Sequence, residues 1–255
     1  MGAKIVASNT GVDYERAAGE YAAHRRAHGG VLEQLVARCR PGQGFRLLEV
    51  GCGTGNYISA LVARLGCRAW GLDPALQMLA QARAPARPVH WLQGQAERLP
   101  FAGQSLDLIF SVDVIHHVAD RPAFYRQAAR ALRPGGWLCT VTDSAEIIRR
   151  REILSGYFPE TVAIELARYP RLTQLEAWMA AAGLVEIEAP VVKAPYEIAD
   201  ARPFRDRAYS SLHLISDDAW RAGLARLERD LARGPVRGVS RYACVWGRTA
   251  PGPRA

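Results

Sequence analysis

Apolar and polar residues alternate in a regular order along the middle of the chain. Short apolar runs predict buried strands near residues 46–51, 68–73, 88–93, 106–112 and 136–142. Amphipathic stretches between them predict helices at about 55–65, 75–83 and 121–132. Strands that alternate with helices favour right-handed crossovers and a parallel sheet covered on both faces. The expected fold class is therefore α/β.

Further elements are expected on both sides of this core. Residues 12–26 and 31–38 predict two helices before the first strand, and residues 185–188 and 242–247 predict a sixth and a seventh strand. A capped helix should end at Gly183, and another should begin at Ser216. The predicted organisation is an N-terminal helical cover over 1–40, a core over 41–193 and 240–250, and an inserted substrate or lid region over 194–239.

Three alternate glycines, Gly51, Gly53 and Gly55, follow the first predicted strand. Glycine permits backbone angles closed to other residues and lets a ligand approach the main chain, so this corner is a candidate ligand site. A dinucleotide-binding fingerprint would place its third glycine where this chain has Asn56. That difference disfavours a nicotinamide oxidoreductase.

Polar residues also stand where the other strands end. Asp73 closes the second strand at about the offset where a carboxylate binds ribose hydroxyls in nucleotide-binding α/β folds. A carboxylate suits a diol because it offers acceptors alone. Ligands of such sheets sit beyond the carboxyl ends of the strands. Four residues are therefore expected to share one crevice: Gly51, Asp73, Gln95 and Ser111.

The run Glu49-Val50-Gly51-Cys52-Gly53-Thr54-Gly55 resembles the first motif of class I S-adenosylmethionine (SAM) dependent methyltransferases. The resemblance extends over roughly residues 40 to 145, and the segment around His116 and His117 is similar to the paired histidines of ubiquinone/menaquinone-biosynthesis-type small-molecule methyltransferases. It implies a Rossmann-like, seven-stranded, mostly parallel sheet with an antiparallel last strand.

This resemblance also implies a cofactor and a reaction. The cofactor would be SAM, the product S-adenosylhomocysteine, and the methyl group would pass to a small-molecule acceptor by in-line displacement. The implied cofactor-binding residues are Glu49, Gly51, Cys52, Gly53, Gly55, Asp73, Pro74, Met78, Gln95, Ala96, Glu97, Ser111 and His116. Gln95 departs from the Asp usual in related proteins, but its amide still offers an uncharged acceptor. Aminocarboxypropyl transfer and non-catalytic SAM binding stay open as alternatives.

Candidates for catalysis and acceptor binding lie outside the glycine corner. The sulfonium is already a strong electrophile, so a base is not required; any deprotonation would fall to His116, His117, His213 or Tyr21. The acceptor-binding candidates are Tyr14, Tyr21, Arg202, Arg205, Tyr209 and His213. Core aromatics, a structural histidine pair and a solvated, arginine-rich lid or dimer surface remain the alternatives. Arg149, Arg150 and Arg151 are expected on a wet helix face.

Composition and charge bear on the location of the protein and on its partners. No apolar run approaches ~18 residues, so no membrane span is expected. The five scattered cysteines lack metal-ligand spacing and favour reduced thiols in the cytoplasm, without a metal site. The net charge of +8 comes almost wholly from arginines spread along the chain, and no nucleic-acid-binding motif accompanies it. The expected partner is thus a small molecule, with a possible homodimer and without nucleic acid.

Overall fold

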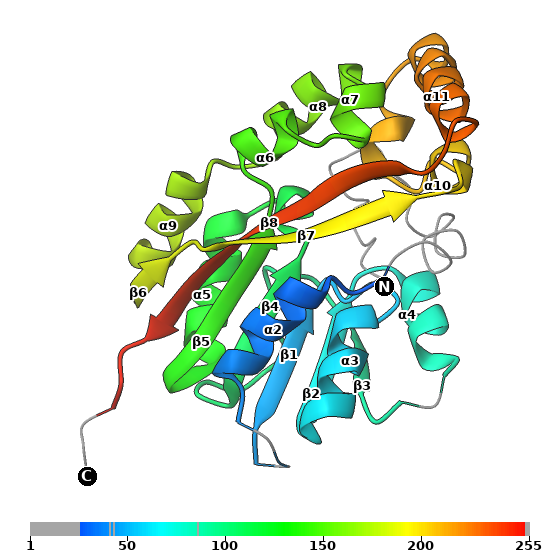
Figure 1. The fold of residues 1–255 in the computed structure, drawn as a ribbon. Coiled ribbons are helices and arrows are strands. Elements are labelled where there is room, and N and C mark those ends of the chain that lie inside the picture. Colours follow the sequence, from blue (N-terminus) through cyan, green and yellow to red (C-terminus); the bar gives the residue numbers. More distant parts are fainter. Residues whose placement is uncertain (1–25, 41, 43, 86, 253–255) are drawn as a thin grey trace, which may run out of the picture.

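The computed structural model describes residues 26–40, 42, 44–85 and 87–252, which form an open sheet flanked by helices (Figure 1). Five strands run parallel in the order β3, β2, β1, β4, β5. They are β1 (Arg46–Val50), β2 (Arg68–Asp73), β3 (His90–Gln93), β4 (Leu106–Val112) and β5 (Leu132–Thr142). Each lies within a few residues of the strand expected from its apolar run, so the predicted parallel core is confirmed.

Three more strands complete the sheet: β6 (Leu184–Glu188), β7 (Val191–Ile198) and β8 (Val236–Thr249). β8 runs antiparallel to β5, and both β6 and β7 pair antiparallel with β8. Ala243 pairs with Thr142 of β5 and with Val191 of β7, so β6 and β7 share one edge of β8. The sheet has eight strands rather than seven because this edge is broken before Val191 by Pro190, which has no N–H for a ladder.

Helices bury apolar side chains on each face of the sheet. On one face, α2 (Gly29–Arg38) and α3 (Asn56–Leu65) share a core with β1, β4, β5 and β8 that includes Leu35, Leu61 and Trp246. On the other, α5 (Arg121–Ala131) and α9 (Leu172–Ala181) contribute Phe124 and Met179 to a second core. A further helix, α4 (Leu76–Arg83), links β2 to β3. Helices were predicted at α2, α3, α4, α5 and α9, whereas the helix predicted over 12–26 lies, apart from Arg26, outside the described residues.

A separate group of helices, here called the helical cap, consists of residues 145–168 and 202–231. It contains α6 (Ala145–Arg149), α7 (Leu154–Tyr157), α8 (Glu160–Arg168), α10 (Arg202–Arg205), the 3-10 turn η2 (Ser210–His213) and α11 (Asp217–Leu231). Ile153, Phe158, Phe204 and Leu227 belong to its own apolar core. Figure 1 shows these helices gathered at one end of β7 and β8. Two segments that are distant in the sequence thus form the cap, whereas the sequence predicted an inserted region over 194–239 alone.

The ends of that predicted insertion lie in the sheet. Residues 194–198 belong to β7 and residues 236–239 to β8, which is why β8 is longer than the strand expected at 242–247. The helix expected at Ser216 is α11, whose Ser216 hydroxyl accepts a hydrogen bond from the Ala219 N–H at 3.2 Å. No helix in the described ranges is long and apolar enough to cross a membrane.

Candidate functional site

The glycine corner between β1 and α3 requires glycine at its turning points. Gly51, Gly53 and Gly55 have φ angles of +69°, +51° and +76°, in the left-handed region that L side chains rarely adopt. A Cβ on Gly51 would lie 2.3 Å from Cγ2 of Val114, and one on Gly55 would lie 2.3 Å from a ring carbon of Trp91. The corner is therefore shaped by both backbone conformation and close packing.

Asp73 joins this corner to the start of α4. Its Oδ2 accepts a hydrogen bond from the Gly53 N–H at 2.8 Å, and its Oδ1 accepts one from the Ala75 N–H at 2.9 Å. The carboxylate is buried, yet each oxygen carries a second lone pair. The structure thus brings together the glycines and the acid that the sequence placed at the ends of β1 and β2.

Glu49 lies in β1 and is buried beneath the same corner. Its Oε2 accepts the Ile58 N–H of α3 at 3.0 Å. Burial raises the pKa of this carboxyl well above its ordinary value, and the nearby Asp73 raises it further. Glu49 therefore ties the strand to the first turn of the helix, and Cys52 packs beside it as a buried thiol.

The remaining predicted cofactor residues occupy different environments. Met78 and Ala96 are buried, while Pro74 and Gln95 are exposed. Glu97 accepts hydrogen bonds from the N–H groups of Ala119 and Asp120 at 2.9 and 3.3 Å, so it fastens the loop after η1 (Ile115–His117).

Two hydroxyls near the corner test whether a polar ligand fits there. The Oγ atoms of Thr54 and Ser111 are buried and have no hydrogen-bond partner within the part of the chain that the structure describes. Buried polar atoms are nearly always hydrogen-bonded in folded proteins. These hydroxyls fit a ligand rich in hydroxyl, amino and carboxyl groups, as SAM is.

The histidine pair follows β4 in η1. The His116 ring stacks on Tyr169 with centroids 4.0 Å apart, and the His117 ring lies 3.9 Å from it. Burial, His117 and neighbouring arginines hold the pKa of His116 well below its ordinary value, and burial and Arg168 lower the pKa of His117 to about 3. Both rings are therefore neutral near pH 7, each with one N–H and one unprotonated nitrogen.

Several predicted acceptor residues lie apart from this region. His213 is exposed in η2. Arg202 pairs with Asp200 at 2.9 Å and Arg205 pairs with Glu228 at 2.6 Å, and both side chains are more than half exposed, at 68% and 52%. Tyr14 and Tyr21 lie outside the described residues. Tyr209 does line a cavity beneath the helical cap, where its ring stacks on Phe204.

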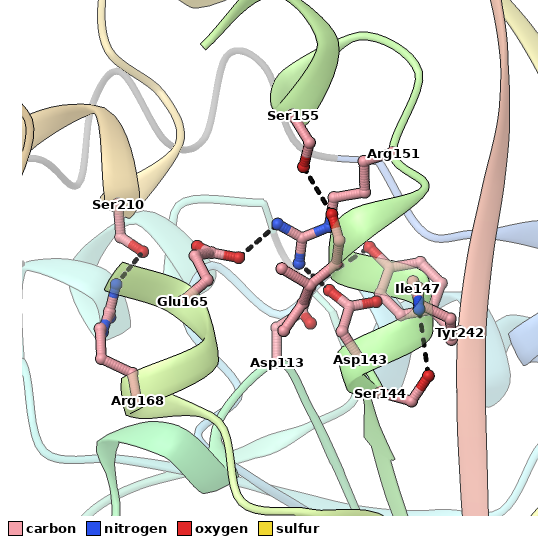
Figure 2. Close-up of polar contacts among 11 residues, drawn as sticks. Asp113, Asp143, Ser144, Ile147, Arg151, Ser155, Glu165, Arg168, Ser210 and Tyr242 are labelled. Carbon is pink, nitrogen blue, oxygen red and sulfur yellow. Dashed lines mark hydrogen bonds and ion pairs between the residues drawn. The ribbon is translucent and has the colours of Figure 1, made fainter. Parts of the chain in front are cut away.

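This cavity has a volume of about 240 Å³. Asp113 and Asp143 follow β4 and β5 directly, and the cap supplies Arg151 and Glu165. Figure 2 shows the Arg151 guanidinium between Asp143 and Glu165, to both of which it is ion-paired. Arg151, predicted on a wet helix face, is instead 19% exposed because these two carboxylates draw it inward.

Asp143 lies among other charged groups at the base of the cavity. Burial raises the pKa of Asp143 to about 7, and Asp113 and Glu165 add to that shift, although Arg151 opposes it. The Tyr242 hydroxyl donates to Oδ2 of Asp113 at 3.2 Å. Sequence reasoning did not assign Asp113 or Asp143. The signal was present, because each follows an apolar strand just as Asp73 closes β2.

Comparison with known proteins identifies the core. A family model described as a methyltransferase domain matches residues 48–140. The ubiquinone biosynthesis O-methyltransferase of Rhizobium etli is 31% identical over 169 residues, which cover 63% of this chain and 63% of that protein. Residues 48–140 of this chain are thus similar to a methyltransferase domain. The resemblance stated from the glycine motif is thus confirmed, and the match spans less than two thirds of this relative.

Solved structures show the same methyltransferase fold. The YcgJ protein of Bacillus subtilis has a TM-score of 0.61 and 20% identity, covering 88% of this chain and 100% of its own. Phosphoethanolamine N-methyltransferase 2 of Haemonchus contortus, solved with phosphomonomethylethanolamine and S-adenosylhomocysteine, has a TM-score of 0.57 and 20% identity, covering 92% of this chain and 56% of its own. Among the described residues of this chain, no group of three His, Cys, Asp or Glu side chains is placed to hold a metal ion.

Proposed function

We propose that this protein transfers the methyl group of SAM to a small-molecule acceptor. The observation that carries the proposal is the direct hydrogen bond between the Gly53 N–H and Asp73, which brings the glycine corner and the acid at the end of β2 together inside the matched domain. The printed names of the relatives, O-methyltransferases and an N-methyltransferase, support the same reaction class. When bound, SAM supplies a methyl group already activated by a sulfonium.

The proposed contacts of the cofactor follow from the geometry of the corner. The left-handed turn at Gly51, Gly53 and Gly55 is the proposed contact of the methionine portion, because glycine leaves the main chain without a Cβ. The Asp73 carboxylate offers acceptors alone and therefore suits the ribose diol, and the hydroxyls of Thr54 and Ser111 can complete their hydrogen bonds with polar groups of the ligand. Met78 and Ala96 offer apolar surface suited to the adenine ring.

The chain's own contribution to the reaction is positioning and exclusion of water. Proximity and alignment can supply a large share of a rate enhancement when the electrophile is already activated. His116 and His117 are neutral near pH 7, so each ring has one nitrogen that can accept a hydrogen bond, and their lowered pKa makes them weak proton acceptors. The proposed proton acceptor is Asp143, because its raised pKa lies near neutrality.

Some earlier expectations remain predictions within this proposal. Tyr14 and Tyr21 stay candidates for the acceptor side of the site, and so do His213, Arg202 and Arg205, which lie on the cap. A homodimer, a cytoplasmic location and the lack of a nucleic-acid partner likewise stay predictions.

A binding and product assay tests the proposal. Calorimetry should show that the purified chain binds both SAM and S-adenosylhomocysteine. Incubation with SAM and a panel of phenols and amines should yield S-adenosylhomocysteine and a product heavier by one methyl group. A product heavier by an aminocarboxypropyl group would replace methyl transfer by the alternative reaction. Absence of affinity for both SAM and S-adenosylhomocysteine would reject the proposal altogether.

A further inference from the structure

Three arginines line a second cavity, which lies between the start of α5 and the connection from α8 to α9. The volume of this cavity is about 480 Å³. We propose that this cavity, here called the arginine groove, binds a phosphate group through Arg121, Arg168 and Arg171. Within the described chain its lining shares no residue with the glycine corner, so the inference goes beyond the proposed methyl transfer and does not depend on it.

The described lining of the arginine groove contains positive charge alone. The other six residues of the lining are uncharged. In the part of the chain that the structure describes, the three guanidinium groups form no ion pair, and those of Arg121 and Arg168 donate to neutral oxygens. An anionic ligand would therefore meet cations that no carboxylate already occupies.

Two carboxylates close to these arginines in the sequence bind other groups. At the start of α5, Asp120 accepts a hydrogen bond from the Ala123 N–H at 2.8 Å. Glu165, one turn before Arg168 in α8, is ion-paired with Arg151. Burial lowers the pKa of Arg121, a shift that a carboxylate beside its guanidinium would oppose. The positive charge of the groove thus has no partner among these neighbours.

Arg168 has hydrogen-bond donors without a partner. Its Nη1 donates to the Ser210 hydroxyl at 3.4 Å, as Figure 2 shows, whereas its Nε and Nη2 are buried and have no hydrogen-bond partner among the described residues. Buried polar atoms are nearly always hydrogen-bonded in folded proteins. Nε and Nη2 form one edge of the planar guanidinium, and such an edge binds two oxygens of a phosphate in parallel. Because the bond to Ser210 is long, Arg168 loses little when it turns this edge to a ligand.

Arg121 and Arg171 supply the other two cations. Arg121 donates from Nε to the Ile115 carbonyl at 3.0 Å and from Nη2 to the Arg168 carbonyl at 3.4 Å, and its Nη1 makes no hydrogen bond to a described residue. Arg171 is exposed and precedes the first turn of α9, which no side chain caps. The N–H groups at the start of a helix carry partial positive charge, which adds to that of the arginines.

The number of unpaired cations favours a phosphate over a singly charged anion. A phosphate monoester carries a charge of about −1.5 to −2 at pH 7 and three acceptor oxygens, whereas a carboxylate has one charge and two oxygens. The phosphate can be a free ion or part of an organic ester. Tyr169 lines both the arginine groove and the cavity beneath the helical cap, so an ester held in the groove has a neighbouring cavity for its organic part.

Calorimetry on the full chain at constant ionic strength tests the arginine groove with three probes. Inorganic phosphate should bind, and acetate should bind roughly ten-fold or more weakly, because it carries one charge and makes fewer charge-assisted hydrogen bonds. Phenyl phosphate distinguishes the two sources of the phosphate. Tighter binding of phenyl phosphate than of inorganic phosphate would support an ester, and equal binding would support the free ion.

Variants link phosphate binding to this groove. Arg168→Gln should weaken the binding of inorganic phosphate roughly ten-fold, as expected for lost hydrogen bonds to a charged group. Arg171→Gln changes an exposed side chain, so the fold should be retained while phosphate binding weakens by roughly three-fold. The matched control is Arg126→Gln, which removes an exposed arginine of α5 outside the lining and should leave the affinity unchanged. Thermal unfolding without phosphate measures the fold of each variant.

Three results would overturn the inference. The first is a folded chain that binds neither inorganic phosphate nor phenyl phosphate, or that binds acetate as tightly as both. The second is a phosphate affinity that survives in Arg168→Gln and Arg171→Gln, because the phosphate would then bind elsewhere. The third is an equal loss in Arg126→Gln, which would assign the binding to net charge alone. None of these measurements involves SAM, so the proposed methyl transfer is tested separately.

Discussion

The Gly53 N–H donates a hydrogen bond to Oδ2 of Asp73 at 2.8 Å, which joins two parts of the chain twenty residues apart. The bond fixes the glycine corner after β1 against the end of β2, which are neighbours in the parallel sheet. Since ligands of such sheets lie beyond the carboxyl ends of the strands, one contact sets the width of the proposed cofactor site. The same bond makes Asp73 a shared support of fold and binding.

Replacing Asp73 should therefore weaken both the binding of the cofactor and the stability of the fold. Asp73→Ala should weaken the binding of S-adenosylhomocysteine by about 1–3 kcal/mol, because the Gly53 and Ala75 N–H groups and the ribose hydroxyls lose their acceptor. Calorimetry measures the affinity, and thermal unfolding without ligand measures the fold. Asp218→Ala, an exposed carboxylate of α11, is the matched control. Unchanged affinity in Asp73→Ala would remove this residue from the cofactor site.

Two glycines allow backbone strain to be separated from steric fit. Gly51 and Gly66 have similar φ angles, +69° and +59°, but a Cβ on Gly51 would strike Val114 whereas one on Gly66 meets nothing within 4 Å. Gly66→Ala should cost about 1–2 kcal/mol, the penalty of a left-handed alanine. Gly51→Ala should cost a further ~1–3 kcal/mol from overpacking. Urea unfolding measures both, and equal losses would show that Val114 moves aside without cost.

The triple arginine run provides an internal comparison of buried and exposed charge. Arg151→Ala leaves Asp143 and Glu165 buried without their cation and should destabilise the fold by about 3–5 kcal/mol. Arg150→Ala removes an exposed pair with Glu146 and should change stability by no more than ~0.5 kcal/mol. Urea unfolding of the two variants side by side measures the difference. Similar small changes in both would mean that Arg151 does not hold the cap.

Local sequence patterns predict the features that depend on neighbouring residues, and they do not predict the contacts between distant segments. The glycine corner, Asp73 and the strands that precede them are encoded within a few residues, so spacing alone predicted where they meet. The Asp143 and Glu165 cluster depends on α8 folding back over β5, and nothing near Arg151 signals that return. Arg202 and Arg205 were predicted to bind the acceptor, but both form exposed ion pairs. Arginine content alone cannot distinguish a binding surface from a solvated one.

Acidification should destabilise the fold through the histidine pair. His116 and His117 stay neutral in the folded chain below their ordinary pKa of 6.5, down to about 3 for His117, but become protonated on unfolding. The unfolded state then binds more protons, so stability falls as pH falls below about 6.5, by up to ~1.4 kcal/mol per pH unit for each ring.

Asp143 changes stability with pH in the opposite direction to the histidines. Its pKa is about 7 in the folded chain and ordinarily 3.8, so the folded state binds the extra proton between these two values. The stability that this carboxyl contributes is therefore lost as pH rises from about 3.8 to about 7.

Urea unfolding between pH 4.5 and 8 separates these opposed contributions through the slope of the unfolding free energy against pH, and not through its absolute value. His117→Asn should flatten the loss of stability below pH 6.5, because one proton fewer is taken up on unfolding. Asp143→Asn should make the same loss steeper, since the opposing carboxyl is removed. His213→Asn, at an exposed position, should leave the slope of the parent chain unchanged. If His117→Asn and His213→Asn gave the same slope, His117 would already become protonated in the folded state. The description of a neutral, buried histidine pair beside Tyr169 would then be wrong.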